Sequence, residues 1–145
     1  MSVSEPFHNF TPDEVNALIP QMEDHFKSFW GYRQNAQNVL HELRKNVKDT
    51  PTQTPAEIAQ QQIRQSQAHY LLEQAQKKLD AVVDLGGVIK DLEMGLVDFH
   101  HILEFEEEIV FLCWKYGEKK VRFWHGVHEG FDSRKPFVKR TSPSA

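Results

Sequence analysis

The sequence lacks the features that mark several large classes of protein. It has one cysteine among 145 residues, which excludes a disulfide framework and a zinc cluster built from cysteines. The longest apolar run, residues 109–114, is far shorter than the roughly 18 residues that a membrane helix needs. Basic residues are not in excess, since 17 Lys and Arg stand against 21 Asp and Glu. We therefore expect neither a membrane-spanning protein nor a nucleic-acid binder.

The opening segment, residues 1–10, has neither the basic start nor the apolar centre of a secretory signal. A lone cysteine is compatible with a reducing compartment. A hydrophobic share of 39% is too high for a disordered chain, and the length fits one domain. These features predict a soluble, cytoplasmic, single-domain protein.

A long helix is predicted to begin at residue 11. Thr11 can cap it, Pro12 suits its first position, and Glu14 can close a capping box. Pro20 predicts a kink or a short first helix. Beyond the cap, a set of mostly apolar residues recurs in alternating steps of four and three residues, which is typical of a helix packed along its length against another helix. The positions are Val15, Ile19, Met22, Phe26, Phe29, Arg33, Ala36, Leu40, Leu43 and Val47, and nine of the ten are apolar.

A second helix repeats the same start signal after a turn at residues 49–53. Thr54, Pro55 and Glu57 occupy the cap, first and third positions, and Gly86-Gly87 predicts the end of the helix. Each helix has about 30 residues and is roughly 45 Å long. Residues 10–85 are therefore predicted to form a long antiparallel, coiled-coil-like hairpin.

A second apolar stripe widens the face of the first helix beyond what one partner helix covers. Self-association into a four-helix arrangement would bury it, so we expect a homodimer. The alternative is that Phe26, Phe29 and Trp30 meet the C-terminal segment instead. The stripe consists of Leu18, Trp30, Tyr32 and Val39.

The C-terminal segment, residues 86–137, changes to a strand-like pattern. Extended pieces are predicted at 88–92 and 95–99, and clear strands at 109–114 and 121–125 with a turn at 116–119. The fold class is accordingly α+β, a helical hairpin carrying a small antiparallel sheet. Residues 138–145 are predicted to form a flexible basic tail.

Three ordered motifs in this segment resemble a bacterial family catalogued as domain of unknown function 2203, whose members automatic naming sometimes labels DivIVA-like. They begin at Asp91-Leu92-Glu93, Leu112-Cys113-Trp114 and Trp124-His125, and residues 10–20 are also similar to the family. The resemblance covers most of residues 10–137 and implies no activity. The family motif singles out Asp91, Glu93, Asp98, Trp114, Glu118, Trp124, His125, Glu129, Gly130, Phe131 and Arg134. The sequence departs from it at His100, where we expect proline, and at His128.

One hypothesis for this segment is a divalent metal site. Imidazole and carboxylate ligands together suit Zn, Fe, Mn or Ni, and residues three apart share a face of a helical turn. The candidate ligands are Asp98, Glu118, His125, His128 and Glu129, with His100 and His101 as further members of the shell. The alternative is that His125 is hydrogen-bonded to Asp98 or Glu118 while the other histidines are solvated.

A second hypothesis is an acid–base site. Asp91, Asp98, Glu118 and His125 would converge in a pocket with aromatic walls, which raise the pKa of a carboxyl group. The alternative is a buried polar network that stabilises the sheet. The walls would be Trp114, Trp124 and Phe131. Cys113, among apolar neighbours, is predicted to be a buried and unreactive thiol.

These observations support two functional hypotheses. The first is a small homodimeric cytosolic protein with a His/carboxylate site in its C-terminal segment that holds a divalent metal ion. The second is a non-catalytic coiled-coil scaffold or adaptor that binds another protein through its helical face. Neither hypothesis specifies a reaction.

Overall fold

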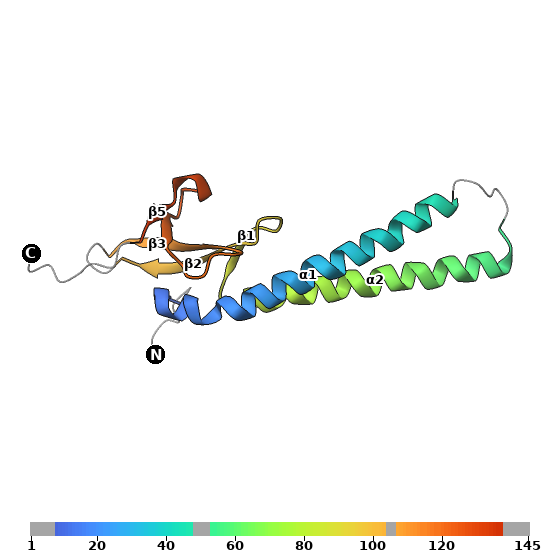
Figure 1. Cartoon of the computed structure of the whole chain (residues 1–145), viewed down its shortest axis with the longest axis horizontal. Helices are drawn as coiled ribbons and strands as arrows, with labels where there is room; N and C mark the ends of the chain where they lie inside the picture. The colour runs from blue at the N-terminus through green and yellow to red at the C-terminus, as the bar shows by residue number, and fades with distance from the viewer. Residues whose placement is uncertain (1–7, 48–52, 104–106, 138–145) are drawn as a thin grey trace, which may run out of the picture. The chain divides into compact units, whose positions relative to one another are not determined.

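The computed structural model describes residues 8–47, 53–103 and 107–137. Within these residues the fold is α+β: two long helices packed as a hairpin precede a five-stranded antiparallel sheet (Figure 1). The predicted fold class is confirmed. The predicted tail and most of the predicted turn at 49–53 lie outside the described residues. The elements are α1 (Pro12–Val47), α2 (Pro55–Asp84), β1 (Val88–Asp91), β2 (Leu96–Ile102), β3 (Ile109–Lys115), β4 (Phe123–Gly126), the short 3-10 helix η1 (Phe131–Ser133) and β5 (Lys135–Pro136).

Both helices begin with the predicted capping box. The Thr11 amide donates to Glu14 Oε1 at 2.9 Å, and the Glu14 amide donates to Thr11 Oγ1 at 3.1 Å. Thr54 and Glu57 make the same pair of bonds in α2 at 3.0 and 3.1 Å. Of the two outcomes expected at Pro20, a kink or a short first helix, the short helix is wrong, since α1 runs continuously through that residue. Burial of the side chains on both sides of the proline accounts for this continuity.

The chain divides into two compact units, and the first consists of residues 24–81. Here the outer parts of α1 and α2 pack together. Phe26, Phe29 and Ala36 of α1 are buried, as are Ala68 and Ala75 of α2. These small α2 residues let the two helices approach closely. An ion pair between Glu42 and Arg64, at 3.1 Å, also joins the helices.

The second unit consists of residues 1–23 and 82–145, and it contains the sheet. The chain before α1 is tied to β2, because the Phe10 amide donates to the His100 carbonyl at 2.8 Å and the Phe10 ring packs edge-on against Phe99. The end of α2 also lies against this strand: a Cβ added to Gly87 would be 2.5 Å from Val97 Cγ1. One face of the sheet, bearing Val97 and Phe99, is therefore covered by helix ends.

Strand register decides which side chains lie on the opposite face. The sheet order is β1-β2-β3-β4-β5, and each strand pairs antiparallel with the next. Asp98 of β2 faces Cys113 of β3, and Phe111 of β3 faces His125 of β4. Successive side chains of a strand point to opposite faces. Asp98, Cys113 and His125 therefore share the face that Val97 and Phe99 do not occupy.

Among the described helices, none combines the length and the apolar character needed to cross a membrane.

Candidate functional site

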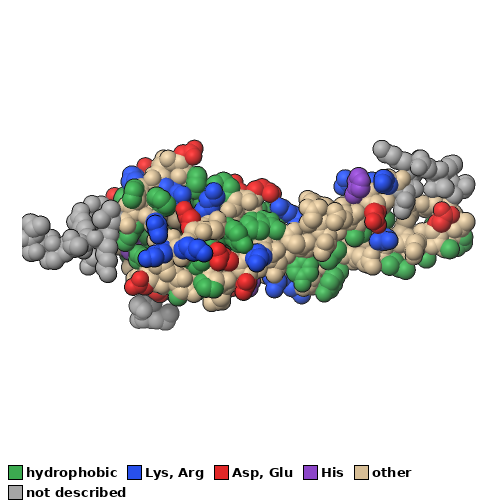
Figure 2. Space-filling view, in the orientation of Figure 1, with side chains coloured by type: hydrophobic (Ala, Val, Ile, Leu, Met, Phe, Trp, Pro, Cys, Tyr) green, Lys and Arg blue, Asp and Glu red, His purple; other side chains and the backbone are tan. Residues whose placement is uncertain are grey.

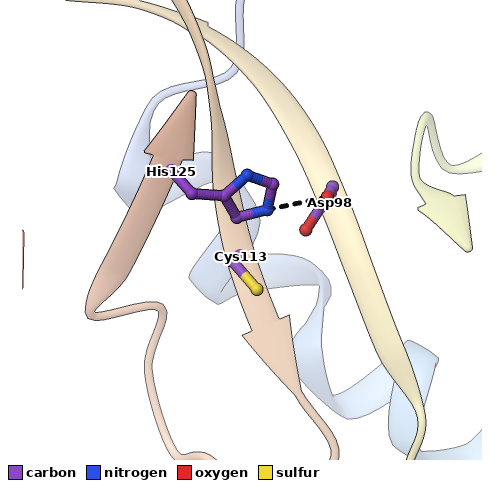
Figure 3. Close-up of side chains that lie close together, drawn as sticks. All are labelled: Asp98, Cys113 and His125. Carbon is purple, nitrogen blue, oxygen red and sulfur yellow. Dashed lines mark ion pairs between the residues drawn. The ribbon is translucent and has the colours of Figure 1, made fainter. Parts of the chain in front are cut away.

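Three neighbouring strands bring together one group of potential metal ligands. Asp98, Cys113 and His125 each offer one ligand atom, and these atoms all lie within 4.8 Å of one another (Figure 3). Asp98 and Cys113 are fully buried, and His125 is 2% exposed. Buried polar groups of this kind are costly unless they are paired or bound to a metal. Among the described residues, this is the group of His, Cys, Asp and Glu side chains that lies close enough together to hold a metal ion.

The orientation of the His125 ring is set by the contacts that its two nitrogens make. Nδ1 lies 2.8 Å from the carbonyl oxygen of Gly126, which can only accept a hydrogen bond, so Nδ1 carries the proton and donates it. Nε2 is then directed at Asp98, with Oδ2 of that carboxyl 3.0 Å away. This is the arrangement in which one nitrogen is held by a backbone carbonyl while the other faces a proton or a metal ion.

The carboxyl group of Asp98 is poorly satisfied in its buried position. Although Oδ2 is close to His125 Nε2, neither carboxyl oxygen has a well-directed hydrogen bond among the described residues. Burial raises the pKa of Asp98, and the opposing influences, led by the charge on His125, do not offset it. The site therefore favours binding of a cation or a proton beside this carboxyl.

The thiol of Cys113 is held in its neutral form. Burial, with a smaller contribution from the neighbouring charge on Asp98, raises its pKa to about 12. This agrees with the prediction of a buried thiol that is unreactive by itself. Because His125 uses Nδ1 for Gly126 and turns Nε2 toward Asp98, the ring is not arranged as a base for the thiol.

Glu118, one of the predicted ligands, is committed to other partners. Its carboxylate accepts two hydrogen bonds from Arg134, at 3.1 and 3.0 Å, and one from the Lys115 amide at 2.8 Å. The guanidinium of Arg134 also lies between two aromatic rings, 4.1 Å from the Phe123 centroid and 4.2 Å from that of Phe131. Glu118 and Arg134 thus tie η1 to the strands.

Glu129 and His128, the other two predicted ligands, are both exposed. Glu129 Oε1 accepts hydrogen bonds from the Gly126 amide at 2.6 Å and from Lys135 Nζ at 2.7 Å. Since the Gly126 carbonyl holds the His125 ring, Glu129 acts one residue away from the buried group, by fixing Gly126. Of the five predicted ligands, the structure brings Asp98 and His125 into the buried group.

The predicted acid–base pocket is dispersed over both faces of the sheet. Asp91 accepts a hydrogen bond from the Met94 amide at 2.8 Å, in the turn after β1. Trp114 directly follows Cys113 in β3, and Trp124 directly precedes His125 in β4, so both tryptophans lie on the other face.

His100 and His101, the further members of the predicted metal shell, have other neighbours. His101 Nδ1 is 2.7 Å from the Phe10 carbonyl oxygen, and the His100 ring lies beside that of Phe111 with 4.8 Å between the centroids.

Cys113 was not among the predicted metal ligands. Its proximity to Asp98 arises from the pairing of β2 with β3, which places the two residues opposite each other. The sequence held one signal for this contact. Side chains alternate between the two faces of a strand, so Cys113 shares a face with Asp98 in every second register of the two predicted strands.

The model of an uncharacterised conserved protein family, DUF2203, matches residues 8–137. The chain belongs to the DUF2203 family. The resemblance inferred from the C-terminal motifs is thereby confirmed, and the DUF2203 match extends over both helices as well as the sheet. No curated protein and no solved structure matches the chain.

Several of the positions that the DUF2203 motifs single out are joined in the structure. Asp98 contacts His125, and Glu118 binds Arg134. Glu129 holds the residue next to His125. In this member of DUF2203, the motif residues Asp98 and His125 thus belong to the buried group, and Glu129 supports it through Gly126.

Proposed function

We propose that this protein binds a divalent metal ion through Asp98, Cys113 and His125, and that zinc is the ion best suited to the site. The observation that carries the proposal is the convergence of three different ligand atoms, all within 4.8 Å of one another, in a buried position. A thiolate, an imidazole and a carboxylate oxygen are the three donor types that proteins use for zinc. Iron, manganese and nickel are weaker candidates, since a thiolate favours softer metals.

The spacing of the donors supports this assignment. Two nitrogen or oxygen ligands at about 2.0 Å from a tetrahedral zinc ion are roughly 3.3 Å apart. The Asp98 Oδ2 to His125 Nε2 distance of 3.0 Å is close to that edge. The ligand atom of Cys113 lies within 4.8 Å of both of these atoms, so one ion placed among the three would be near each of them. Three protein ligands leave one tetrahedral position for a further group, so the proposal concerns binding and specifies no reaction.

The chemistry of the site also predicts how metal binding would depend on pH. The Cys113 thiol must lose its proton before it can bind a metal ion, and its pKa of about 12 opposes that loss. A bound dication lowers the pKa of a coordinating thiol and neutralises the Asp98 carboxylate. Binding should therefore release protons and strengthen as the pH rises. The same ion would satisfy the carboxyl oxygens that have no well-directed partner among the described residues.

Cobalt substitution gives the sharpest test. Metal-free protein is titrated with Co²⁺, whose bond to a thiolate produces a strong charge-transfer absorption, and Zn²⁺ is then added as a competitor. We expect one ion per chain, a thiolate band that zinc abolishes, and loss of the band in Cys113→Ser. The matched control is His128→Ala, which removes an exposed histidine near the site and should leave binding unchanged.

Circular dichroism of Cys113→Ser shows whether the variant is folded, which we expect because the substitution is nearly isosteric. Loss of the band in a folded variant is then due to the missing thiolate. If the folded wild-type protein gives no thiolate band and binds no zinc in a calorimetric titration, the proposal fails. It also fails if the metal binds equally well to folded Cys113→Ser.

A further inference from the structure

The outer side of α2 leaves large apolar side chains exposed in the hairpin unit. Ile63 is 55% exposed and Tyr70 is 58% exposed, although both belong to a helix that packs on α1. Ala68, two residues before Tyr70, is buried, which places Tyr70 about 160° around the helix from the residue that faces α1. Figure 2 shows hydrophobic side chains along the edge of the hairpin that α2 forms. Ile63 and Tyr70 therefore do not belong to the buried row of α2 that contains Ala68 and Ala75.

Ile63 and Tyr70 belong to a regular stripe along α2 that also contains two small residues. Ala59, Ile63, Ser66 and Tyr70 follow one another in steps of four, three and four, the spacing of a helix packed along a partner helix. All four are exposed, and an open groove runs along them and reaches Val39 of α1. The stripe thus has the form of a second coiled-coil seam.

We propose that this stripe is the contact between two copies of the chain, with the two α2 helices antiparallel. The register follows from the sequence: the small Ala59 would face the partner's large Tyr70, and Ile63 would face the partner's small Ser66. Both pairs then match a large side chain with a small one, and both occur twice about a two-fold axis. A parallel pairing would instead set Tyr70 against Tyr70 and Ala59 against Ala59, leaving one layer crowded and the other empty.

The charge around the stripe also suits self-association. In a chain with 26% charged residues, the positions that border the stripe between Ala59 and Tyr70 are Gln60, Gln62, Gln67 and His69. In the antiparallel register, Gln60 would lie near the partner's Gln67, and Gln62 near the partner's His69. These groups can hydrogen-bond across the interface, and no two like charges meet. Four such layers make a small interface, so the expected affinity is roughly micromolar.

This inference is independent of the metal site, which lies in the other unit of the chain. Sedimentation equilibrium of the full chain, from low micromolar to several hundred micromolar, should show a transition from 16.9 kDa to twice that mass. Ile63→Lys should weaken the dimer roughly a hundred-fold, because the substitution enters the interface twice and each buried charge costs more than ten-fold. The matched control is Gln65→Lys, which adds the same charge at an exposed position off the stripe.

Cross-linking tests the orientation. Ala59→Cys and Tyr70→Cys chains, oxidised as an equimolar mixture, should form a disulfide between the two variants. Neither variant should cross-link to itself, since equivalent positions would lie about 16 Å apart along the antiparallel pair. The native Cys113 does not compete, because it is buried. A chain that stays monomeric at several hundred micromolar overturns the proposal, as does an Ile63→Lys dimer of unchanged affinity or cross-linking of Ala59→Cys only to itself.

Discussion

Oδ2 of Asp98 lies 3.0 Å from Nε2 of His125, and both side chains are almost completely buried. An acid and an imidazole so deeply buried are coupled, because the charge of either one is tolerated only beside the other. The carbonyl of Gly126 holds the opposite nitrogen of the ring, so His125 cannot turn away from the carboxyl without losing a hydrogen bond. The pair is a fixed element of the sheet, whether a proton or a metal ion lies beside it.

This coupling predicts unequal costs for single and paired substitutions. His125→Phe should lower the free energy of unfolding by about 3 kcal/mol, since it leaves the Asp98 carboxyl buried without its partner. The double variant Asp98→Leu/His125→Phe should recover much of that loss, because two apolar side chains leave no buried charge. Urea denaturation of the metal-free proteins measures both values. Additive effects in the double variant would show that the two residues act independently.

The raised pKa of Asp98 predicts a specific dependence of stability on pH. Because the folded state binds the carboxyl proton more tightly than the unfolded state, its stabilising effect is complete below the ordinary pKa of 3.8. That effect is lost as the pH rises from 3.8 through the raised pKa of the folded protein. We expect the unfolding free energy of the wild type, minus that of Asp98→Asn, to fall over this range.

The subtraction is what makes this measurement specific. Glu14, Glu57 and Glu129 have lowered pKa values, mainly because they accept hydrogen bonds, and they change stability with pH in the opposite direction. All three are present in both proteins, so their contributions cancel. With a chelator in the buffer, a pH-independent difference between wild type and Asp98→Asn would contradict the assignment.

The thiol of Cys113 should react very slowly in the folded, metal-free protein. With a pKa of about 12, only roughly one thiol in ten thousand is ionised at about pH 8, compared with about one quarter for an ordinary cysteine. We expect iodoacetamide to alkylate the folded protein at least about a thousand-fold more slowly than the protein unfolded in urea. Mass spectrometry measures both rates. Comparable rates in the folded and unfolded protein would mean that the thiol is accessible and ionised.

The helical hairpin was predictable because its signals are local. Each capping box spans four residues, and the repeat from Val15 to Val47 needs no knowledge of distant contacts. The site was only partly predictable. Asp98 and His125 were identified by residue type, whereas the inclusion of Cys113 depends on the exact register of β2 and β3. The pairing of Glu118 with Arg134 joins residues 16 positions apart through a turn and a 3-10 helix, and no periodicity encodes it.

Two glycines give a paired test of how α2 ends on the sheet. In Gly87→Ala the new Cβ would lie 2.5 Å from Val97 Cγ1 and 3.2 Å from Phe99 Cζ, so we expect a loss of about 1–3 kcal/mol in unfolding free energy. Gly31 lies in α1, and a Cβ there meets nothing within 4 Å among the described residues. Gly31→Ala should therefore stabilise the protein by about 0.5–1 kcal/mol. Equal effects in urea denaturation would contradict the close contact at Gly87.

Glu129 should influence metal binding without touching the ion. Its carboxylate holds the Gly126 amide at 2.6 Å, and the Gly126 carbonyl in turn holds His125 Nδ1 at 2.8 Å. Removing such a supporting contact typically weakens metal affinity by about 10–100-fold. We expect that loss for zinc in Glu129→Ala, measured by competition with a chelator of known affinity.

Lys135→Met separates this support from simple electrostatics. The substitution removes the 2.7 Å ion pair to Glu129 Oε1 but leaves the carboxylate beside Gly126. If Glu129 acts by orienting His125, Lys135→Met should retain nearly the full zinc affinity while Glu129→Ala loses it. If Glu129→Ala keeps wild-type affinity, the His125 ring is held without the carboxylate, because the Gly126 carbonyl then suffices.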